Sequence, residues 1–332
     1  MRYIIRKFVI KSFQKLRKGD WIMVRLKKDS VSPKPPTSEI IIKLQTKELN
    51  APHGNKIKLE PLLENMGGIL VRAPQELTEK MGIPFMITHA EVKIFDDDGY
   101  KKAVAERHIL GTAIGNGGGK FFPEEQDIFI NADAGLRNET GSACSILGLT
   151  PEEDLATYLK LFELMVEINL IGYFYHELTH LNHYLYDSKL FESGKAWNRR
   201  KKREQKGEIK KQGYFRDLVD TFAVSRDLAL VEGIASLVEH RILGDTLHKV
   251  SEGRFNYKNT TLNVQERDLS LLEKMHSLLC DPHSLGLWFV RTVGNLVEEN
   301  PIKLLIDNPP RTIRELLEPE LYARKIGQNQ GV

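Results

Sequence analysis

Two histidines and a glutamate near the middle of the chain have the spacing of a metal site. The stretch His176-Glu177-Leu-Thr-His180 lies in a strongly apolar, helix-like segment. An α-helical turn takes about 3.6 residues, so the two histidines project from one face and can both reach one Zn²⁺ at about 2.0–2.1 Å. Glu177 is rotated by about 100° from His176. That offset suits a general base, which takes a proton from metal-bound water without binding the metal.

A carboxylate farther along the chain is a candidate for the third ligand. Catalytic zinc usually takes three protein ligands and leaves one position for water. Glu232 stands in an apolar, helix-like segment, residues 227–240, where burying a carboxylate is costly unless it is paired or bound to a metal. Gly233 beside it is small, so another helix can approach closely. Two alternatives stay open: Glu232 belongs to a solvent-exposed polar stripe, or His183, on the face of the two histidines, is the third ligand.

The order of these motifs resembles that of a known family. H-E-x-x-H followed by a helix that reads E-G-x-A is similar to the gluzincin metallopeptidases, whose zinc is held by two histidines and one glutamate. Two later stretches, His283–Val290 and Pro309–Tyr322, resemble the Y-x-x-G-x-x-F-V helix and the P-P-x-S-T-x-Q-x-L-H-P-x-x-Y signature of one branch of predicted gluzincins. The resemblance covers residues 150–325.

Carried over residue by residue, the resemblance implies one Zn²⁺ per chain. Its ligands would be His176, His180 and Glu232, with Glu177 as general base. His283 replaces the branch's tyrosine and is the first candidate for the donor that stabilises the tetrahedral oxyanion.

Two other positions depart from the family. Glu318 replaces the branch's late histidine, and Ser236 stands where well-studied gluzincins carry an aspartate that hydrogen-bonds a ligand histidine. Such partners orient the metal-bound imidazole. Ser236, Asp227 or a backbone carbonyl must then do so here.

These features predict a zinc metallopeptidase that hydrolyses peptide bonds in a peptide or protein substrate. A carboxylate di-iron bundle would also use Glu177-x-x-His180 and needs a second E-x-x-H on another helix. Glu273-x-x-His276 has this spacing, so metal analysis that finds about one zinc and no iron must exclude this class. The alternative is a non-catalytic zinc-scaffold protein that binds nucleic acid or a protein partner through the basic insert, residues 195–211.

Composition limits the class of protein. Of 332 residues, 41% are hydrophobic and 28% charged, with a net charge of +3, which is typical of a soluble globular protein. Cys144 and Cys280 are too few and too far apart for a disulfide framework. The chain has neither an apolar run of membrane-spanning length nor a secretory signal pattern. We therefore expect a cytoplasmic protein.

The first third of the chain mixes basic and β-forming segments. Residues 1–30 have a helical pattern of apolar and basic positions, which indicates either a helix packed on its own domain or one in peripheral contact with an anionic membrane. Residues 32–37 read as a proline-rich linker. Strands are expected at 39–45, 68–72, 90–95, 108–114 and 127–133, with a turn at 96–99 and a flexible glycine turn, not a phosphate loop, at 115–120.

We expect an α+β fold, in which a mixed α/β region with a β-sheet precedes a mainly helical, zincin-like region. A helix should start at Thr150 and run towards Asp187, with Gly172 as the expected junction, and a further helix should cover 284–299. The basic insert reads as a charged surface loop or as a nucleic-acid contact. The segments are a basic N-terminal segment and linker (1–38), a β-rich subdomain (39–149), a helical metallopeptidase subdomain (150–325) that carries the insert, and a tail (326–332).

Overall fold

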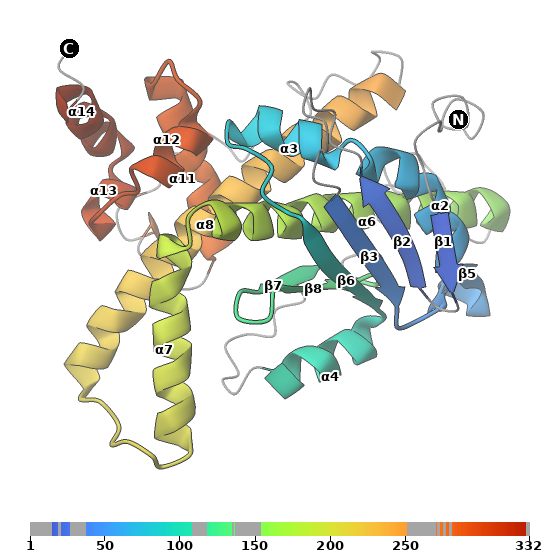
Figure 1. The fold of residues 1–332 in the computed structure, drawn as a ribbon, viewed down its shortest axis with the longest axis horizontal. Coiled ribbons are helices and arrows are strands. Elements are labelled where there is room, and N and C mark those ends of the chain that lie inside the picture. Colours follow the sequence, from blue (N-terminus) through green and yellow to red (C-terminus); the bar gives the residue numbers. More distant parts are fainter. Residues whose placement is uncertain are drawn as a thin grey trace. The chain divides into compact units, whose positions relative to one another are not determined.

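The chain folds as an α+β protein in the computed structural model, and the expected fold class is confirmed (Figure 1). It divides into two compact units: residues 1–75 with 87–178, and residues 76–86 with 179–332. Within the described part, no helix combines the length and the apolar character needed to cross a membrane. The structure describes residues 15–18, 21–26, 38–107, 118–134, 136, 154–250, 270, 273–274, 277–278 and 281–329.

The first unit is built on a six-stranded mixed sheet with the order β1-β2-β3-β6-β8-β7. Strands β3, β6 and β8 run parallel, and the other neighbours pair antiparallel. Because β7 pairs with β8 alone among the described strands, it forms one edge of the sheet. The strands are β1 (Lys15–Lys18), β2 (Trp21–Leu26), β3 (Ser38–Leu44), β6 (His89–Phe95), β7 (Gly119–Phe122) and β8 (Asp127–Asn131).

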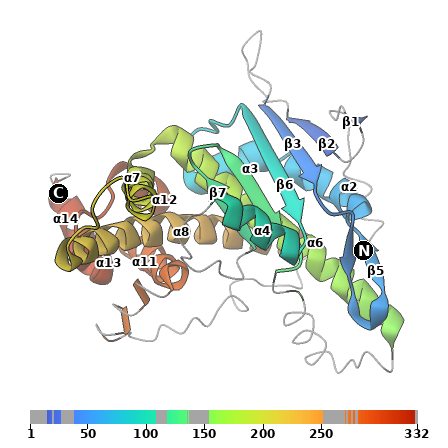
Figure 2. The ribbon, with the colours of Figure 1, turned by 90° about the horizontal axis from the view of Figure 1, so that it is seen from below.

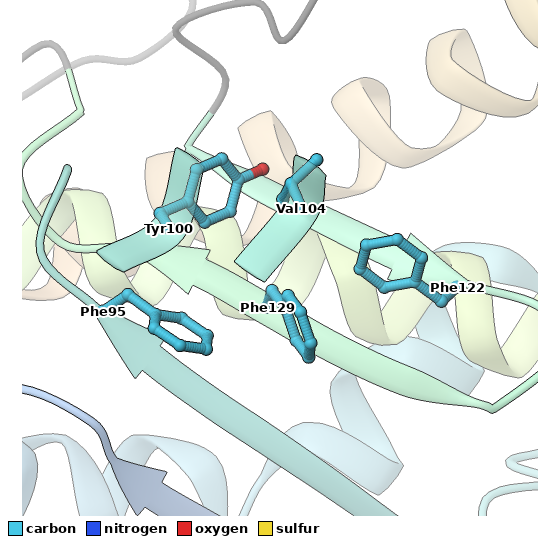
Figure 3. Close-up of a cluster of buried hydrophobic side chains, with 5 residues drawn as sticks. All are labelled: Phe95, Tyr100, Val104, Phe122 and Phe129. Carbon is cyan, nitrogen blue, oxygen red and sulfur yellow. The ribbon is translucent and has the colours of Figure 1, made fainter. Parts of the chain in front are cut away.

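Helices cover both faces of this sheet. On one face, α4 (Asp97–Arg107) packs against the end of the sheet that carries β7. On the other face lies α6 (Leu155–Tyr186), and alternate residues of β7 face the two helices (Figure 2). Figure 3 shows the apolar cluster beneath α4, which comprises Phe95, Tyr100, Val104, Phe122 and Phe129.

Smaller elements complete the first unit. Strands β4 (Glu48–Asn50) and β5 (Lys56–Lys58) form a hairpin around the short helix η1 (Pro52–Gly54). Helix α2 (Leu59–Leu70) follows, and α3 (Ala73–Met81) begins in this unit. The Tyr175 hydroxyl of α6 donates a 3.1 Å hydrogen bond to the Ile69 carbonyl, so α6 is fastened to the end of α2.

The second unit is helical. It holds the end of α6, then α7 (Lys189–Gln205) and the long α8 (Tyr214–Val250). Helix α11 (Pro282–Leu296) packs along α8, and the short helices α12 (Pro301–Asp307), α13 (Ile313–Leu317) and α14 (Pro319–Asn329) follow. The expected helix at 284–299 is therefore confirmed.

Several local predictions are wrong. Residues 68–70 end helix α2, because buried Leu59, Leu62, Leu63 and Leu70 follow a helical period. The predicted turn at 96–99 is a helix start, where the Asp96 carboxylate accepts the Gly99 N–H at 2.8 Å and so caps α4.

The basic segments also differ from expectation. Residues 15–18 and 21–26 are paired strands, not parts of a helix, because their backbone groups complete the ladder beside β3. The basic insert is helical as far as Gln205. The rest of the predicted N-terminal helix, the linker, the strand at 108–114 and the helix start at Thr150 lie outside the described residues.

Candidate metal centre

Helix α6 carries the H-E-x-x-H motif on an uninterrupted run of turns. The Asp154 carboxylate caps its start by accepting the Thr157 N–H at 3.0 Å. The helix passes through Gly172 without the expected junction, although an interior glycine costs about 1 kcal/mol. Leu170, Ile171 and Phe174 around it are buried, and their packing offsets that cost. His176 and His180 consequently stand one turn apart on one rigid rod, and both are buried.

Helix α8 places Glu232 opposite them. The residues that precede and follow Glu232 in α8 are buried. Helix α11 comes so close that a Cβ atom on Gly233 would lie 2.2 Å from the carbonyl carbon of Gly286. The predicted close helix approach at Gly233 is thereby confirmed. The Glu232 side chain is only 13% exposed, and its Oε2 lies 3.2 Å from Nε2 of His180.

His176, His180 and Glu232 form a group that could hold a metal ion. One ligand atom from each lies within 4.8 Å of the others, and neither His183 nor any other described residue joins the group. Ligand atoms at about 2.0–2.2 Å from tetrahedral zinc stand roughly 3.3–3.6 Å apart. The 3.2 Å contact between His180 and Glu232 nearly matches that edge, and the other two donor separations are no longer than 4.8 Å, so the group could close around a small divalent cation.

His283 stands at the outer side of the ligand carboxylate. Its Nδ1 lies 3.0 Å from Oε2 of Glu232, and its side chain is 57% exposed. His283 is the second residue of α11, which starts at Pro282. The Asp281 carboxylate caps this helix by accepting the Ser284 N–H. The His283 side chain is therefore open to solvent and also contacts the Glu232 carboxylate.

Glu177 lies against the backbone of edge strand β7. The residue is 4% exposed. A Cβ atom on Gly119 would lie 2.5 Å from its Oε1 and 2.8 Å from its Cγ, and one on Gly118 would overlap the ring of Tyr173. The flexible turn predicted at 115–120 lies outside the described residues up to 117, and its last glycine, Gly119, is the first residue of β7. Gly118 and Gly119 let the chain approach α6 at the level of Tyr173 and Glu177, a role that sequence reasoning missed.

His183 is fully buried one turn beyond His180. Burial, and after it the neighbouring His180, lower the pKa of His183 to about 3. Its imidazole is therefore neutral near pH 7. The ring packs edge-on against Phe191 at 5.2 Å between centroids, and neither ring nitrogen has a hydrogen-bond partner among the described residues. His183 thus serves as a packed core side chain beside the site.

Asn182, another residue that sequence reasoning missed, anchors a loop to helix α6. Its side-chain carbonyl accepts the Met86 N–H at 2.7 Å, and its amide donates to the Pro84 carbonyl at 3.2 Å. Asn182 is fully buried two residues after His180, but no local sequence pattern distinguishes it from a surface asparagine.

Asp227 and Ser236, the candidates for orienting a ligand histidine, are both buried. Asp227 is engaged with its neighbour Arg226, which donates to its carboxylate at 2.5 and 2.7 Å. Arg226 also donates to the Arg311 carbonyl at 2.6 Å. Arg226, paired with Asp227, therefore ties α8 to the segment before α13.

The two later motifs pack on each other. The rings of Phe289 and Tyr322 meet at 5.7 Å between centroids, and the buried Tyr322 hydroxyl donates to the Asn308 carbonyl at 2.6 Å. Thr312 and Glu315 form a capping box at the start of α13. Glu318, at the branch's late histidine, is paired with Arg314 on the surface. These residues stabilise the C-terminal helices.

No family model matches the chain, and the comparisons with curated proteins and with solved structures find no match either. Function must therefore be inferred from the geometry of the site itself.

Proposed function

We propose that this protein is a zinc-dependent peptidase in which Glu177 is the general base. The single observation that carries the proposal is the group formed by His176, His180 and Glu232, with ligand atoms within 4.8 Å of one another. The next residue after His176 is a buried carboxylate outside that group.

The donor set favours a transition-metal ion such as zinc over calcium or magnesium. Two imidazole nitrogens and one carboxylate oxygen are ligands that catalytic zinc sites use, whereas calcium and magnesium prefer oxygen donors alone. Three protein ligands leave a fourth position for water or substrate. Bound zinc would lower the pKa of a water molecule towards about 7 and polarise a peptide carbonyl.

Glu177 supplies the proton transfers. Placed about 100° around α6 from His176, it can take the proton from the attacking water and deliver it to the leaving amine. Contact with Gly119 restricts where its carboxylate can go. His283 is the proposed donor to the oxyanion, because it is accessible and stands at the ligand carboxylate.

Strand β7 is the proposed docking edge for an extended peptide. Among the described strands it pairs on one side only, and a peptide can add to a free sheet edge through backbone hydrogen bonds. Because Gly119 of β7 touches Glu177, a peptide added there would pass close to the general base. Short peptides and unfolded protein segments are the substrate class that fits this arrangement.

The first experiment measures bound zinc. Wild type should hold about one zinc per chain, and His176→Ala and Glu232→Ala should lose it. Glu239→Ala is the matched control, since this glutamate lies on the same helix outside the ligand group. Normal zinc binding by Glu232→Ala would show that the ligand assignment is wrong.

The second experiment measures cleavage of a peptide library. Glu177→Gln should keep zinc but lose turnover by about 10²–10⁴-fold, the usual contribution of a general base. Glu163→Gln, on the same helix, should cleave like wild type. If Glu177→Gln behaved like wild type in every assay, a non-catalytic metal scaffold would be the better conclusion.

A further inference from the structure

The basic insert forms one arm of a helical hairpin. Helix α7 and the first part of α8 pair antiparallel, since Arg200 contacts both Asp217 and Asp220 while Glu204 accepts the Gln212 N–H. Figure 1 shows that the connection between them, residues 206–213, lies at the end of the hairpin away from α11–α14 of the same unit. The hairpin therefore presents this connection as a tip.

Most charges along the body of the hairpin neutralise one another. Lys201 pairs with Asp217 at 2.6 Å and Glu204 at 3.3 Å, and Arg203 pairs with Glu208 at 3.5 Å. Arg200 contacts Glu204 at 3.4 Å besides its two aspartates. These cations hold the two helices together and are not available as a phosphate-binding stripe.

The tip differs, because its cations form no ion pairs with the residues that the structure describes. Four basic side chains there are exposed, and none forms an ion pair within the described part of the chain: Lys206, Lys210, Lys211 and Arg216. They fall within eleven residues. An uncompensated cluster of this kind creates a local positive potential that attracts an anionic surface.

Apolar side chains stand among these cations. Tyr214, the first residue of α8, is 76% exposed, and Val219, about a turn and a half later, is 66% exposed. They are the two most exposed large hydrophobic side chains among the described residues. Exposed apolar groups beside basic ones are unfavourable in water but suit the boundary between lipid headgroups and acyl chains.

We propose that this hairpin tip, residues 206–219, binds the surface of a membrane that contains anionic lipids. The lysines and Arg216 would lie against the headgroups, and Tyr214 would take the interfacial position that tyrosine favours. A nucleic acid fits less well. The cations surround the end of a hairpin and do not follow a groove, and stacking on single strands uses several aromatic side chains. The proposal is independent of the metal site.

The test is co-sedimentation of the full-length protein with vesicles of phosphatidylcholine, with and without phosphatidylserine. Wild type should bind only the anionic vesicles, and binding should weaken as salt is raised. Each neutralised cation should weaken binding about fivefold, so Lys210→Gln/Lys211→Gln should bind about 30-fold more weakly (about 1 kcal/mol for each charge). Tyr214→Ser should weaken binding at every salt concentration.

The matched control is Lys102→Gln/Lys160→Gln, which removes the same charge from exposed positions on α4 and α6. It should bind vesicles like wild type. All variants should keep the wild-type melting temperature and zinc content, so that lost binding reflects the surface alone. Three results would each overturn the proposal: no binding by wild type, equal loss in the control, or tighter binding to DNA or RNA than to vesicles through these lysines.

Discussion

The two halves of helix α8 put similar residues to different use. From Tyr214 to Arg226 no side chain with a described placement is fully buried, and the carboxylates pair with cations of α7. From Asp227 to Ile242 most side chains are buried, and Glu232 points its carboxylate at two histidines. A solvated charge needs little from its neighbours, whereas a charge in apolar surroundings must be compensated. The difference shows that burial, not residue type, marks the chemically significant carboxylate.

The largest expected effect comes from removing the buried carboxylate. At a free zinc concentration 1,000 times its Kd, binding should raise the free energy of unfolding of wild type by about 4 kcal/mol. Glu232→Ala should lose most of that gain, while Asp220→Ala, in the exposed half, should retain it. Denaturant titrations with zinc and with a chelator measure both. If zinc stabilised Glu232→Ala as much as wild type, the carboxylates of the two halves of α8 would not differ in their effect on metal binding.

Acid should lower the free energy of unfolding because the buried imidazole of His183 on α6 resists protonation. The unfolded chain binds a proton on His183 near pH 6.5, whereas the folded chain resists it down to about pH 3. Its contribution to the free energy of unfolding should therefore be constant above about pH 6.5 and fall by about 1.4 kcal/mol for each pH unit below it. His183→Leu should remove this slope. Denaturant titrations in chelator between about pH 6 and pH 4 test it, and identical slopes would contradict the burial.

Gly233→Ala tests the close helix contact in the buried half. The added methyl would meet the backbone of Gly286, so we expect a loss of about 1–3 kcal/mol despite alanine's higher helix propensity. Gly194→Ala on α7 is the control, since its Cβ would meet nothing within 4 Å, and it should stabilise by about 0.5–1 kcal/mol. Melting temperatures measure both changes, and a stabilising Gly233→Ala would contradict the contact.

Asp220→Asn should have the smallest effect. It removes one of the carboxylates that Arg200 contacts, and the aspartate is 40% exposed. Exposed ion pairs contribute less than about 1 kcal/mol, so the free energy of unfolding should change by no more than that. A loss above about 2 kcal/mol, beyond the range of such pairs, would show that the hairpin depends on its charges as strongly as the buried half does on packing.

Patterns with a strong local cause were readable in the sequence. The parallel strands β3, β6 and β8 are confirmed, because their β-branched residues are bounded by turn-forming ones. Helix α11 is confirmed through its Asp281 cap and Pro282 start. The grouping of His176 and His180 follows from helical geometry alone.

Features decided by distant residues were not readable. The Gly119 contact with Glu177 joins positions 58 residues apart, and no local pattern specifies it. The ion pairs of Arg200 with α8 form only because the chain turns back on itself. The basic insert, predicted to be a surface loop, is therefore helical as far as Gln205 and paired with carboxylates of α8. The helix junction predicted at Gly172 is wrong, because the buried residues around it stabilise α6 by more than an interior glycine costs.

The residue at position 119 can be compared among homologous chains. Even a methyl group there would meet the carboxylate of Glu177, so any side chain at this position would have to displace the carboxylate that we propose as the general base. A homologous chain that kept both histidines and the distant glutamate but carried a bulkier residue at this point would be expected to bind metal without hydrolysing anything. If the proposed function holds, the residue at this position should therefore separate catalytic from non-catalytic homologues.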